Sequence, residues 1–434
     1  MNRNDEMVLK FREGLKQTER FEPDGLWEYQ KSLLTPLLLH ARAHSPFYRT
    51  RLDAVFNGDE IDFGRWREIP ILTRAEAQTN EKTLAAKAVP PHLGTVSADE
   101  TSGSTGRPLR YLKNGLMDVA ALAMTDRLYR WWDFDGFKTM ASFVSPRRGI
   151  SKPEGDETFG WQTGALEGRH LLRETTGDAE GHARWLAKQR PDYLVSYASM
   201  IEPIAATARD RDIGLAFAKV IARGGIVTGE TRAVCREIFG CSLVDQYGAD
   251  EIGQIACECP RCGQYHINSE VVRVELLDEN NKPVSSGQTG RVVLTGFYNY
   301  AMPLIRYEIG DYATRAQSGH ECAVALPSIS KIVGRYRNTF TLADGRILFP
   351  NMPMKGFRTY LPYTQIQVVQ TDYDRLLVRY VADESGKQPD GKGLEAWLKE
   401  SLDPCFSVQL EEVASIPAAS DGKYEDFVSL VARQ

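Results

Sequence analysis

The segment TSGSTGRP at positions 101–108 is the part of the sequence best suited to binding phosphate. Its glycines let backbone N–H groups approach phosphate oxygens closely, its hydroxyl side chains donate further hydrogen bonds, and its arginine adds a cation. The Walker pattern GxxxxGK[ST] is absent, so a P-loop of that class is excluded. The sequence predicts a polyphosphate-binding loop, with a flexible surface linker as the alternative. The loop residues are Thr101, Ser102, Gly103, Ser104, Thr105, Gly106 and Arg107.

A second group of chemically capable residues is the array C-x-C-x2-C-x3-H, formed by Cys257, Cys259, Cys262 and His266. Four such ligands within ten residues are typical of a closed tetrahedral Zn²⁺ site, which predicts structural zinc. A set of packed thiols is the alternative, and Cys241 or Cys235 could replace one ligand. Cys322 and Cys405 belong to no recognisable pattern.

Charge and composition exclude several classes of function. The 434 residues include 53 Lys and Arg against 58 Asp and Glu, a net charge of −5. This acidic balance argues against a nucleic-acid-binding module, including a zinc finger of that kind. No run of about 18 apolar residues is present, which predicts no membrane span. The N-terminus is charged and lacks the apolar core of a signal peptide, so we expect a cytoplasmic protein.

The elements that must position these residues follow an α/β pattern between about Val96 and Gln246. Buried-type strands alternate with amphipathic helices, which predicts a largely parallel sheet flanked by helices. The predicted strands are 109–112, 139–144, 218–226 and 242–246, and the predicted helices are 116–132, 183–189, 201–208 and 230–239. Upstream, 26–51 has helical periodicity broken at Ser45-Pro46, and Thr73 is a candidate N-cap for a helix with Glu76 at capping-box spacing.

The pattern changes near Val271, after which 272–277 and 291–297 predict antiparallel strands. The last hundred residues predict strands at 365–370, 376–381 and 407–413 and a helix at 393–402, which is a small α+β domain. We expect a large domain over residues 1–334, carrying a zinc-binding insertion at about 257–266, and a small mobile domain over 335–434.

Taken in order along the chain, these motifs resemble the adenylate-forming (acyl-CoA synthetase-like) superfamily. TSGSTGRP is similar to its ATP loop, and YGADE (247–251) to its YGxTE motif. HSPFYRTRL (44–52) and IPILTRAEA (69–77) resemble the phenylacetate–CoA ligase-like branch. PLIRYEIGD (303–311) resembles the motif that ends in a ribose-binding aspartate, and Gly334-Arg335 the hinge motif. The matches cover about residues 40 to 425.

The resemblance implies an enzyme that activates a carboxylic acid with ATP to an acyl-adenylate, releasing pyrophosphate, and then transfers the acyl group to CoA. Its cofactors would be ATP, Mg²⁺ and CoA, and a homodimer is expected. Transfer to a carrier-protein thiol or an amine is an alternative, as is a catalytically silent relative that binds nucleotide.

Roles for individual residues also follow from the resemblance. Glu251 would hold Mg²⁺, and Asp311 would accept both ribose hydroxyls. Lys423, in a loop of the small domain, would neutralise the α-phosphate and the attacking carboxylate once that domain closes. The remaining nucleotide contacts would come from Asp245, Tyr247, Gly248 and Arg335.

The resemblance places the acid beside the turn at Gly229-Glu230. Aromatic and glycine residues together suit a flat ring lying on backbone, which favours an aryl or arylacetic acid. The residues expected there are Phe143, Tyr197, Gly224, Gly225, Ile226, Gly229 and Glu230. Core packing is the alternative for Phe143 and Tyr197.

The sequence departs from the family pattern at several positions. Asp250 replaces the threonine of YGxTE, Arg107 replaces the loop lysine, and Arg337-Asn338 replace the acids of the hinge. The lysine loop continues as the acidic segment Tyr424-Glu425-Asp426. These changes bear on transfer to CoA more than on activation of the acid.

Overall fold

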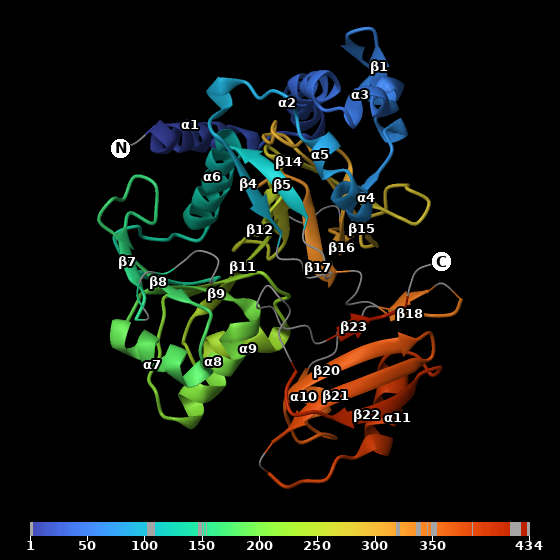
Figure 1. Ribbon diagram of the computed structural model, residues 1–434. Coiled ribbons are helices and arrows are strands. Elements are labelled where there is room, and N and C mark those ends of the chain that lie inside the picture. Colours follow the sequence, from blue (N-terminus) through green and yellow to red (C-terminus); the bar gives the residue numbers. More distant parts are fainter. Residues whose placement is uncertain are drawn as a thin grey trace.

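The computed structural model describes residues 3–101, 109–145, 150, 152, 154–317, 322–335, 340–344, 346–348, 354–383, 385–416 and 427–431. Within these ranges a 13-stranded mixed sheet and a smaller four-stranded sheet carry the architecture. The predicted mixed α/β class is confirmed (Figure 1). In the described part of the chain, no helix is long and apolar enough to cross a membrane.

One half of the large sheet is parallel. Its strands lie in the order β11-β10-β9-β6-β8, and β7 pairs with β8 antiparallel at the edge. The strands β6, β9 and β10 are short and largely buried because both faces are covered, as expected of parallel sheets. The strand bounds are β6 Met140–Val144, β7 Asp156–Phe159, β8 Arg169–Glu174, β9 Tyr193–Tyr197, β10 Lys219–Arg223 and β11 Ser242–Ala249.

Helices cover the two faces of this parallel portion. On one face α7 (Ala179–Gln189), α8 (Ala198–Asp210) and α9 (Gly229–Glu237) pack on Ala141, Leu194 and Val220, among other apolar side chains of the strands. Figure 1 shows these three helices side by side. On the other face, Leu128 and Tyr129 of α6 (Gly115–Trp131) pack against the sheet.

The rest of the large sheet is antiparallel and continues from β11 in the order β12-β13-β17-β16-β15-β14. The antiparallel strands predicted after Val271 are confirmed, although antiparallel pairing already begins at β12. The strands are β12 Gly253–Glu258, β13 Tyr265–Ile267, β14 Val272–Leu277, β15 Thr289–Gly296, β16 Tyr307–Arg315 and β17 Ser328–Arg335.

The N-terminal segment is helical and packs against the antiparallel half. Thr73 caps α4 through a 3.2 Å hydrogen bond from the Glu76 N–H, and the predicted break at Ser45-Pro46 is confirmed. The helices are α1 Arg3–Thr18, α2 Pro23–His44, α3 Tyr48–Arg51, α4 Arg74–Thr79 and α5 Glu81–Leu84, with 3-10 turns at Asp53–Val55, Phe63–Glu68 and Pro91–Leu93. The strands are β1 Phe56–Asn57, β2 Glu60–Ile61, β3 Leu72–Thr73, β4 Val96–Glu100 and β5 Arg110–Asn114.

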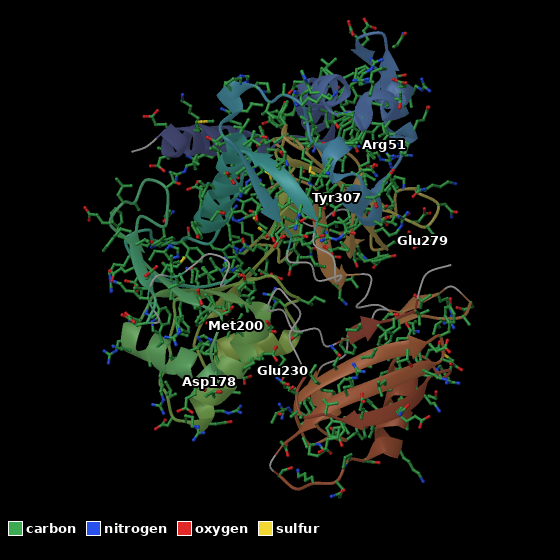
Figure 2. The ribbon with its side chains drawn as sticks, in the orientation of Figure 1. Arg51, Asp178, Met200, Glu230, Glu279 and Tyr307 are labelled. Carbon is green, nitrogen blue, oxygen red and sulfur yellow. The ribbon has the colours of Figure 1, made fainter. Side chains whose placement is uncertain are left out.

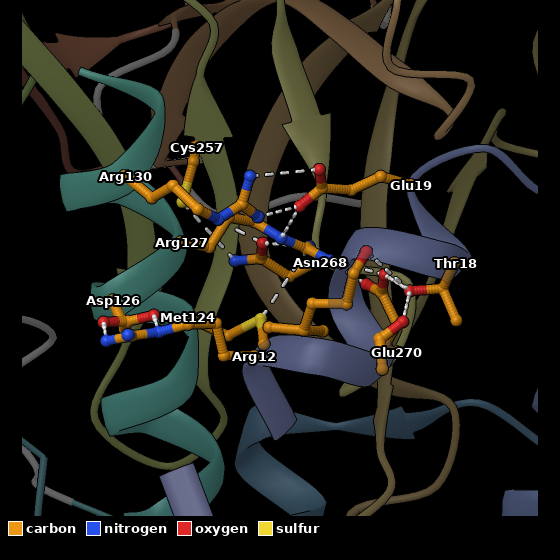
Figure 3. Close-up of polar contacts among 12 residues, drawn as sticks. Arg12, Thr18, Glu19, Met124, Asp126, Arg127, Arg130, Cys257, Asn268 and Glu270 are labelled. Carbon is orange, nitrogen blue, oxygen red and sulfur yellow. Dashed lines mark hydrogen bonds and ion pairs between the residues drawn. The ribbon is translucent and has the colours of Figure 1, made fainter. Parts of the chain in front are cut away.

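Buried ion pairs and hydrogen bonds connect the end of α1 to α6 and to the segment between β13 and β14 (Figure 3). The Arg127 guanidinium lies 2.5 Å from Glu270, and both side chains have zero exposure. Glu19 and Asn268 each accept a further 3.1 Å hydrogen bond from Arg127, and Arg12 pairs with Asp126 nearby. Removing one partner would leave a buried charge without compensation, so this network ties the N-terminus to the core.

The C-terminal portion is a separate α+β unit with its own core. Its sheet has the order β22-β21-β20-β23, and Phe357, Leu394, Leu398 and Phe406 are buried in its core. The elements are β18 Phe340–Thr341, β19 Ile347–Leu348, α10 Met354–Phe357, β20 Tyr363–Asp372, β21 Arg375–Ala382, α11 Gly391–Ser401, β22 Ser407–Glu412 and β23 Phe427–Ser429.

Candidate active site

Two residues expected to bind nucleotide meet although 64 positions separate them. The Tyr247 hydroxyl donates a 2.7 Å hydrogen bond to Oδ2 of Asp311, and both side chains are buried. Tyr247 lies near the end of β11, and Asp311 lies in β16 opposite Arg335 of β17. The structure thus brings together the residues expected at the adenine and the ribose.

Glu251 lies just beyond the end of β11 in a buried polar cluster. Its Oε1 accepts hydrogen bonds from Arg74 Nη1 at 2.9 Å and from the Tyr307 hydroxyl at 3.0 Å. Burial and the charge of Glu251 raise the pKa of Tyr307 well above its ordinary value, so this hydroxyl keeps its proton and donates. Tyr307 lies in the middle of the large portion of the chain (Figure 2).

The carboxylate of Glu251 can also take a hard cation. Both of its hydrogen bonds within the described ranges end on Oε1, which leaves Oε2 for a metal ion. Carboxylate oxygen is a ligand type that Mg²⁺ accepts, usually with water and substrate phosphate completing the shell. The chemistry of this donor therefore fits the expected metal.

Thr101, the first residue of the predicted phosphate loop, is held in place by three hydrogen bonds. The backbone N–H of Thr101 donates to the Leu109 carbonyl at 2.9 Å, and the Thr101 hydroxyl oxygen accepts from the Leu109 N–H at 2.9 Å. Arg74 Nη2 donates a third hydrogen bond, 2.7 Å long, to the same hydroxyl. The other loop residues predicted to bind phosphate, Ser102 to Arg107, lie outside the described ranges.

The Asp245 carboxylate is enclosed in a polar cluster next to the sheet. It accepts 2.7 Å and 2.8 Å hydrogen bonds from the Tyr265 hydroxyl and the Gln246 N–H. Burial raises its pKa to about 7, and the adjacent Glu258 acts in the same direction. Arg232 offsets part of this charge through a 3.0 Å ion pair with Glu258. A role for Asp245 at the adenine stays a prediction.

Gly248 sits at a close backbone approach, since a Cβ there would lie 3.0 Å from the Gly253 carbonyl oxygen. The strand pairing shifts register between Tyr247 and Gly248, an irregularity of the bulge type a few residues before Glu251. Asp250, the residue that departs from the family pattern, accepts a 2.8 Å hydrogen bond from the Tyr111 hydroxyl through its backbone carbonyl. Of the other predicted site residues, Lys423 and the Arg335 side chain lie outside the described part of the structure.

The residues expected around the acid separate into two groups. Tyr197 ends β9, and Gly224, Gly225 and Ile226 follow β10, so they gather at the carboxyl ends of neighbouring parallel strands. Ligands bind at such edges in open α/β sheets. Gly229 and Glu230 begin α9, on which Figure 2 labels Glu230.

Phe143 does not belong to this group. Its side chain is fully buried, and its ring lies 4.8 Å from His182 and 6.0 Å from Trp185 of α7. It therefore faces the helices rather than the strand ends. The structure supports the core-packing alternative for Phe143.

A four-ligand cluster lies beside β12 and β13. The ligand atoms of Cys259, Cys262, His266 and Cys322 all lie within 4.8 Å of one another. The Cys259 and Cys322 sulfurs are 3.8 Å apart, and the Cys262 sulfur is 3.5 Å from Nε2 of His266. Tetrahedral zinc would place two sulfurs about 3.8 Å apart and a sulfur and a nitrogen about 3.6 Å apart.

The histidine in this cluster is already oriented for a metal. Its Nδ1 lies 2.9 Å from the Leu326 carbonyl oxygen, which fixes the proton on Nδ1 and turns the Nε2 lone pair toward the thiols. Such a backbone partner is typical of metal-bound histidine. The donor set and its geometry fit zinc.

Cys257, a predicted zinc ligand, lies outside this cluster, and the fourth member of the cluster is Cys322. The Cys257 sulfur is turned toward Gln254, 3.5 Å from its side-chain oxygen, and lies beside Asn268 in the Arg127 network (Figure 3). Cys235 and Cys241, the other possible ligands, are not in the cluster either. Cys322 comes from a segment 56 positions beyond His266, so ligand spacing alone could not reveal it.

Arg74 and Tyr307 are site residues that the search for chemically capable motifs missed. Arg74 lies in the segment IPILTRAEA and Tyr307 in the segment PLIRYEIGD, and the resemblance implies no role for either side chain. Their importance depends on distances across the fold, which sequence spacing does not report.

No family model matches the chain. Protein CapK of Staphylococcus aureus is 22% identical over 416 residues, covering 93% of this chain and 89% of the relative. Phenylacetate-coenzyme A ligase of Escherichia coli K12 is 26% identical over 399 residues, covering 86% of each chain. The sequence resemblance to that ligase is thereby confirmed.

Solved structures decide the fold. A crystal structure of 2-hydroxyisobutyryl-CoA ligase in the postadenylation state matches with a TM-score of 0.70 at 16% identity, covering 93% of this chain and 89% of that one. The chain has the fold of the adenylate-forming acyl-CoA ligases. An anthranilate CoA ligase matches more weakly, with a TM-score of 0.53 at 12% identity and coverage of 75% and 65%.

Proposed function

We propose that the protein activates a carboxylic acid with ATP and transfers the acyl group to CoA. In the first step a carboxylate oxygen attacks the α-phosphorus and pyrophosphate leaves, which gives an acyl-adenylate. In the second step the CoA thiol attacks the acyl carbon and AMP leaves. The observation that carries this proposal is that Arg74 is hydrogen-bonded both to Glu251 and to Thr101, the first residue of the Gly/Ser/Thr loop.

Each residue of the site has a part in this chemistry. Glu251 would hold Mg²⁺ through Oε2, and the metal would supply charge stabilisation at the phosphates. Asp311, oriented by Tyr247, would accept the ribose hydroxyls. Lys423 would neutralise the reacting anions, and Arg335 would contact the ribose or a phosphate.

The proposed acid is aromatic or arylacetic. It would lie at the strand ends formed by Tyr197, Gly224, Gly225 and Ile226. The names of two similar proteins, a phenylacetate ligase and an anthranilate ligase, support an aromatic acid. The acceptor is CoA, with a carrier-protein thiol or an amine as the outcomes that would revise this half of the proposal.

The Cys259, Cys262, His266 and Cys322 cluster is proposed to bind one structural Zn²⁺. All four positions of a tetrahedral ion would be filled by protein, which leaves none for a substrate. The ion would connect the turn after β12 to the segment before β17.

The division into a large domain, residues 1–334, and a small lid domain, residues 335–434, is part of the same proposal. Closure of the lid would bring the Lys423 loop to the site. A homodimer in the cytoplasm is proposed as well, and sedimentation of the purified chain together with cell fractionation tests these two features.

The experiment is pyrophosphate release across a panel of aryl, arylacetic and short hydroxy acids, each with and without CoA. We expect acid-dependent release, with an acyl-CoA formed when CoA is present. Absence of release with every acid would overturn the enzyme proposal. Retention of cellular function by both Glu251→Ala and Lys423→Ala would instead favour a catalytically silent nucleotide-binding relative.

A further inference from the structure

Backbone contacts of the residues just before Arg74 fix its position, so this position does not depend on its side-chain contacts alone. It is the first residue of α4, directly after the N-cap Thr73. The preceding strand β3 pairs with β16, with Leu72 opposite Tyr307, and the Leu72 N–H donates to the Arg306 carbonyl at 2.9 Å. These contacts fix where the Arg74 side chain begins.

The guanidinium of Arg74 joins segments that are far apart in the sequence. Nη1 donates to Glu251 Oε1 at 2.9 Å and to the Tyr307 hydroxyl at 3.0 Å, while Nη2 donates to the Thr101 hydroxyl at 2.7 Å. The Arg74 and Glu251 side chains are only 15% and 4% exposed. Only a planar fork of donors can make these contacts at once, which a lysine ammonium cannot reproduce.

Arg51 also forms a partly buried ion pair, but this pair does not join separate parts of the site. It contacts Glu76 of α4 at 2.7 Å and 2.9 Å, and its remaining hydrogen bond goes to the Ile71 carbonyl. This pair is also partly buried, at 16% and 33% exposure, but it reaches no residue of the site. A partly buried ion pair is weak evidence of stabilisation, so the position of the Arg74 contacts is what matters.

We propose that Arg74 is a positioning residue that couples the metal-binding carboxylate to the phosphate loop. By holding Glu251 and Thr101 in one hydrogen-bond system, it sets the distance between the metal ion and the triphosphate, so that the two bind as one unit. This inference rests on the proposed function for the identity of the ligands.

The test is binding of α,β-methylene ATP by calorimetry, with and without Mg²⁺. This analogue cannot lose pyrophosphate, so the readout does not depend on turnover. We expect Mg²⁺ to strengthen binding in the wild-type protein, and this gain to fall at least about tenfold in Arg74→Ala, as for a lost charge-assisted hydrogen bond. Arg51→Ala, the matched control, should keep the gain within about twofold.

Two milder variants test the link between Glu251 and Thr101. Arg74→Lys keeps a charge for Glu251 but cannot also reach Thr101, so the Mg²⁺ gain should stay about tenfold below that of the wild type. Thr101→Val should lower the Mg²⁺ gain similarly, and the double variant Arg74→Lys/Thr101→Val should lose no more of the gain than the worse single variant. Full additivity, or an unchanged Mg²⁺ gain in Arg74→Ala at wild-type melting temperature, would overturn the proposal.

Failure of this inference and failure of the proposed function are distinguishable. Normal coupling of nucleotide and Mg²⁺ without acid-dependent pyrophosphate release would remove the proposed function and leave the role of Arg74 standing. Acid-dependent release with an unaffected Mg²⁺ gain in Arg74→Ala would do the reverse. A wild-type protein that does not bind the analogue would overturn both.

Discussion

The Tyr247 hydroxyl lies 2.7 Å from Oδ2 of Asp311, and this bond connects the end of the parallel sheet to its antiparallel half. β11 contributes Tyr247 and β16 contributes Asp311, with β12, β13 and β17 between them in the sheet. A carboxylate that accepts this bond is held in one orientation before any nucleotide arrives. Preorganisation of this kind lowers the ordering cost of binding.

Replacing Tyr247 with Phe should therefore raise the KM for ATP by about 10-fold, because a hydrogen bond to a charged group is lost. The turnover number should stay within about twofold, since the tyrosine does not touch the reacting atoms. Tyr380→Phe is the matched control, because that hydroxyl donates at 3.1 Å to Glu412 in the C-terminal sheet. Equal effects of the two substitutions on KM would contradict a role for Tyr247 at the nucleotide.

Metal content of two cysteine variants should separate the observed cluster from the one expected by spacing. Cys322→Ser should lose the bound zinc, because a structural site needs all four ligands. Cys257→Ser should keep about one zinc per chain, since its sulfur is directed at Gln254. Elemental analysis of the two purified proteins is the measurement, and the opposite pattern would restore the consecutive array as the ligand set.

The cluster of Cys259, Cys262, His266 and Cys322 could be predicted only in part from the sequence. Cys259, Cys262 and His266 lie close together in the chain, so their spacing suffices to predict a site. Cys322 is brought in by the pairing of β13 with β17, a contact between distant segments. Long-range pairing of this kind leaves no local pattern.

In the fold, too, features set by the local sequence were predictable, whereas others were not. The breaks at Ser45-Pro46 and the alternation of strands and helices were predictable because proline and apolar periodicity act locally. The strand β9, Tyr193–Tyr197, was not predicted, although it lies at the centre of the parallel sheet. Its last residue is followed directly by the first residue of α8, so no turn residue marks where the strand ends.

The buried ion pair between Arg127 and Glu270 should be costly to break. Glu270→Gln keeps the shape of the side chain but leaves the arginine charge buried without its counter-ion, which should lower the free energy of unfolding by about 3–5 kcal/mol. Glu157→Gln breaks an exposed pair with Arg169, which solvent screens, so it should leave the unfolding midpoint almost unchanged. Denaturant titration measures both, and similar midpoints would contradict this role of the network.

The raised pKa of Asp245 predicts a specific pH dependence of stability. The carboxyl titrates at about 7 in the folded chain, against 3.8 ordinarily. Between about pH 4 and 7 the folded chain holds a proton that the unfolded chain has lost, so this group makes stability fall as the pH rises through that window. Below pH 4 it has no effect, and above pH 7 its cost is complete.

Asp245→Asn removes that group while keeping its size. The stability difference between variant and wild type should therefore shift in favour of the variant from pH 4 to pH 7 and then become constant. Denaturant midpoints measured for both proteins across this range give the difference directly. Parallel curves would show that folding does not raise the pKa of Asp245.

The most direct test of acid activation follows the carboxylate oxygens. An accepted acid labelled with ¹⁸O in both carboxylate positions is incubated with the protein, ATP, Mg²⁺ and CoA, and the nucleotide product is examined by mass spectrometry. Attack of the carboxylate on the α-phosphorus predicts AMP carrying one ¹⁸O atom, with the other retained in the thioester. Unlabelled AMP, or ADP with label in phosphate, would contradict adenylation as the chemistry of this site.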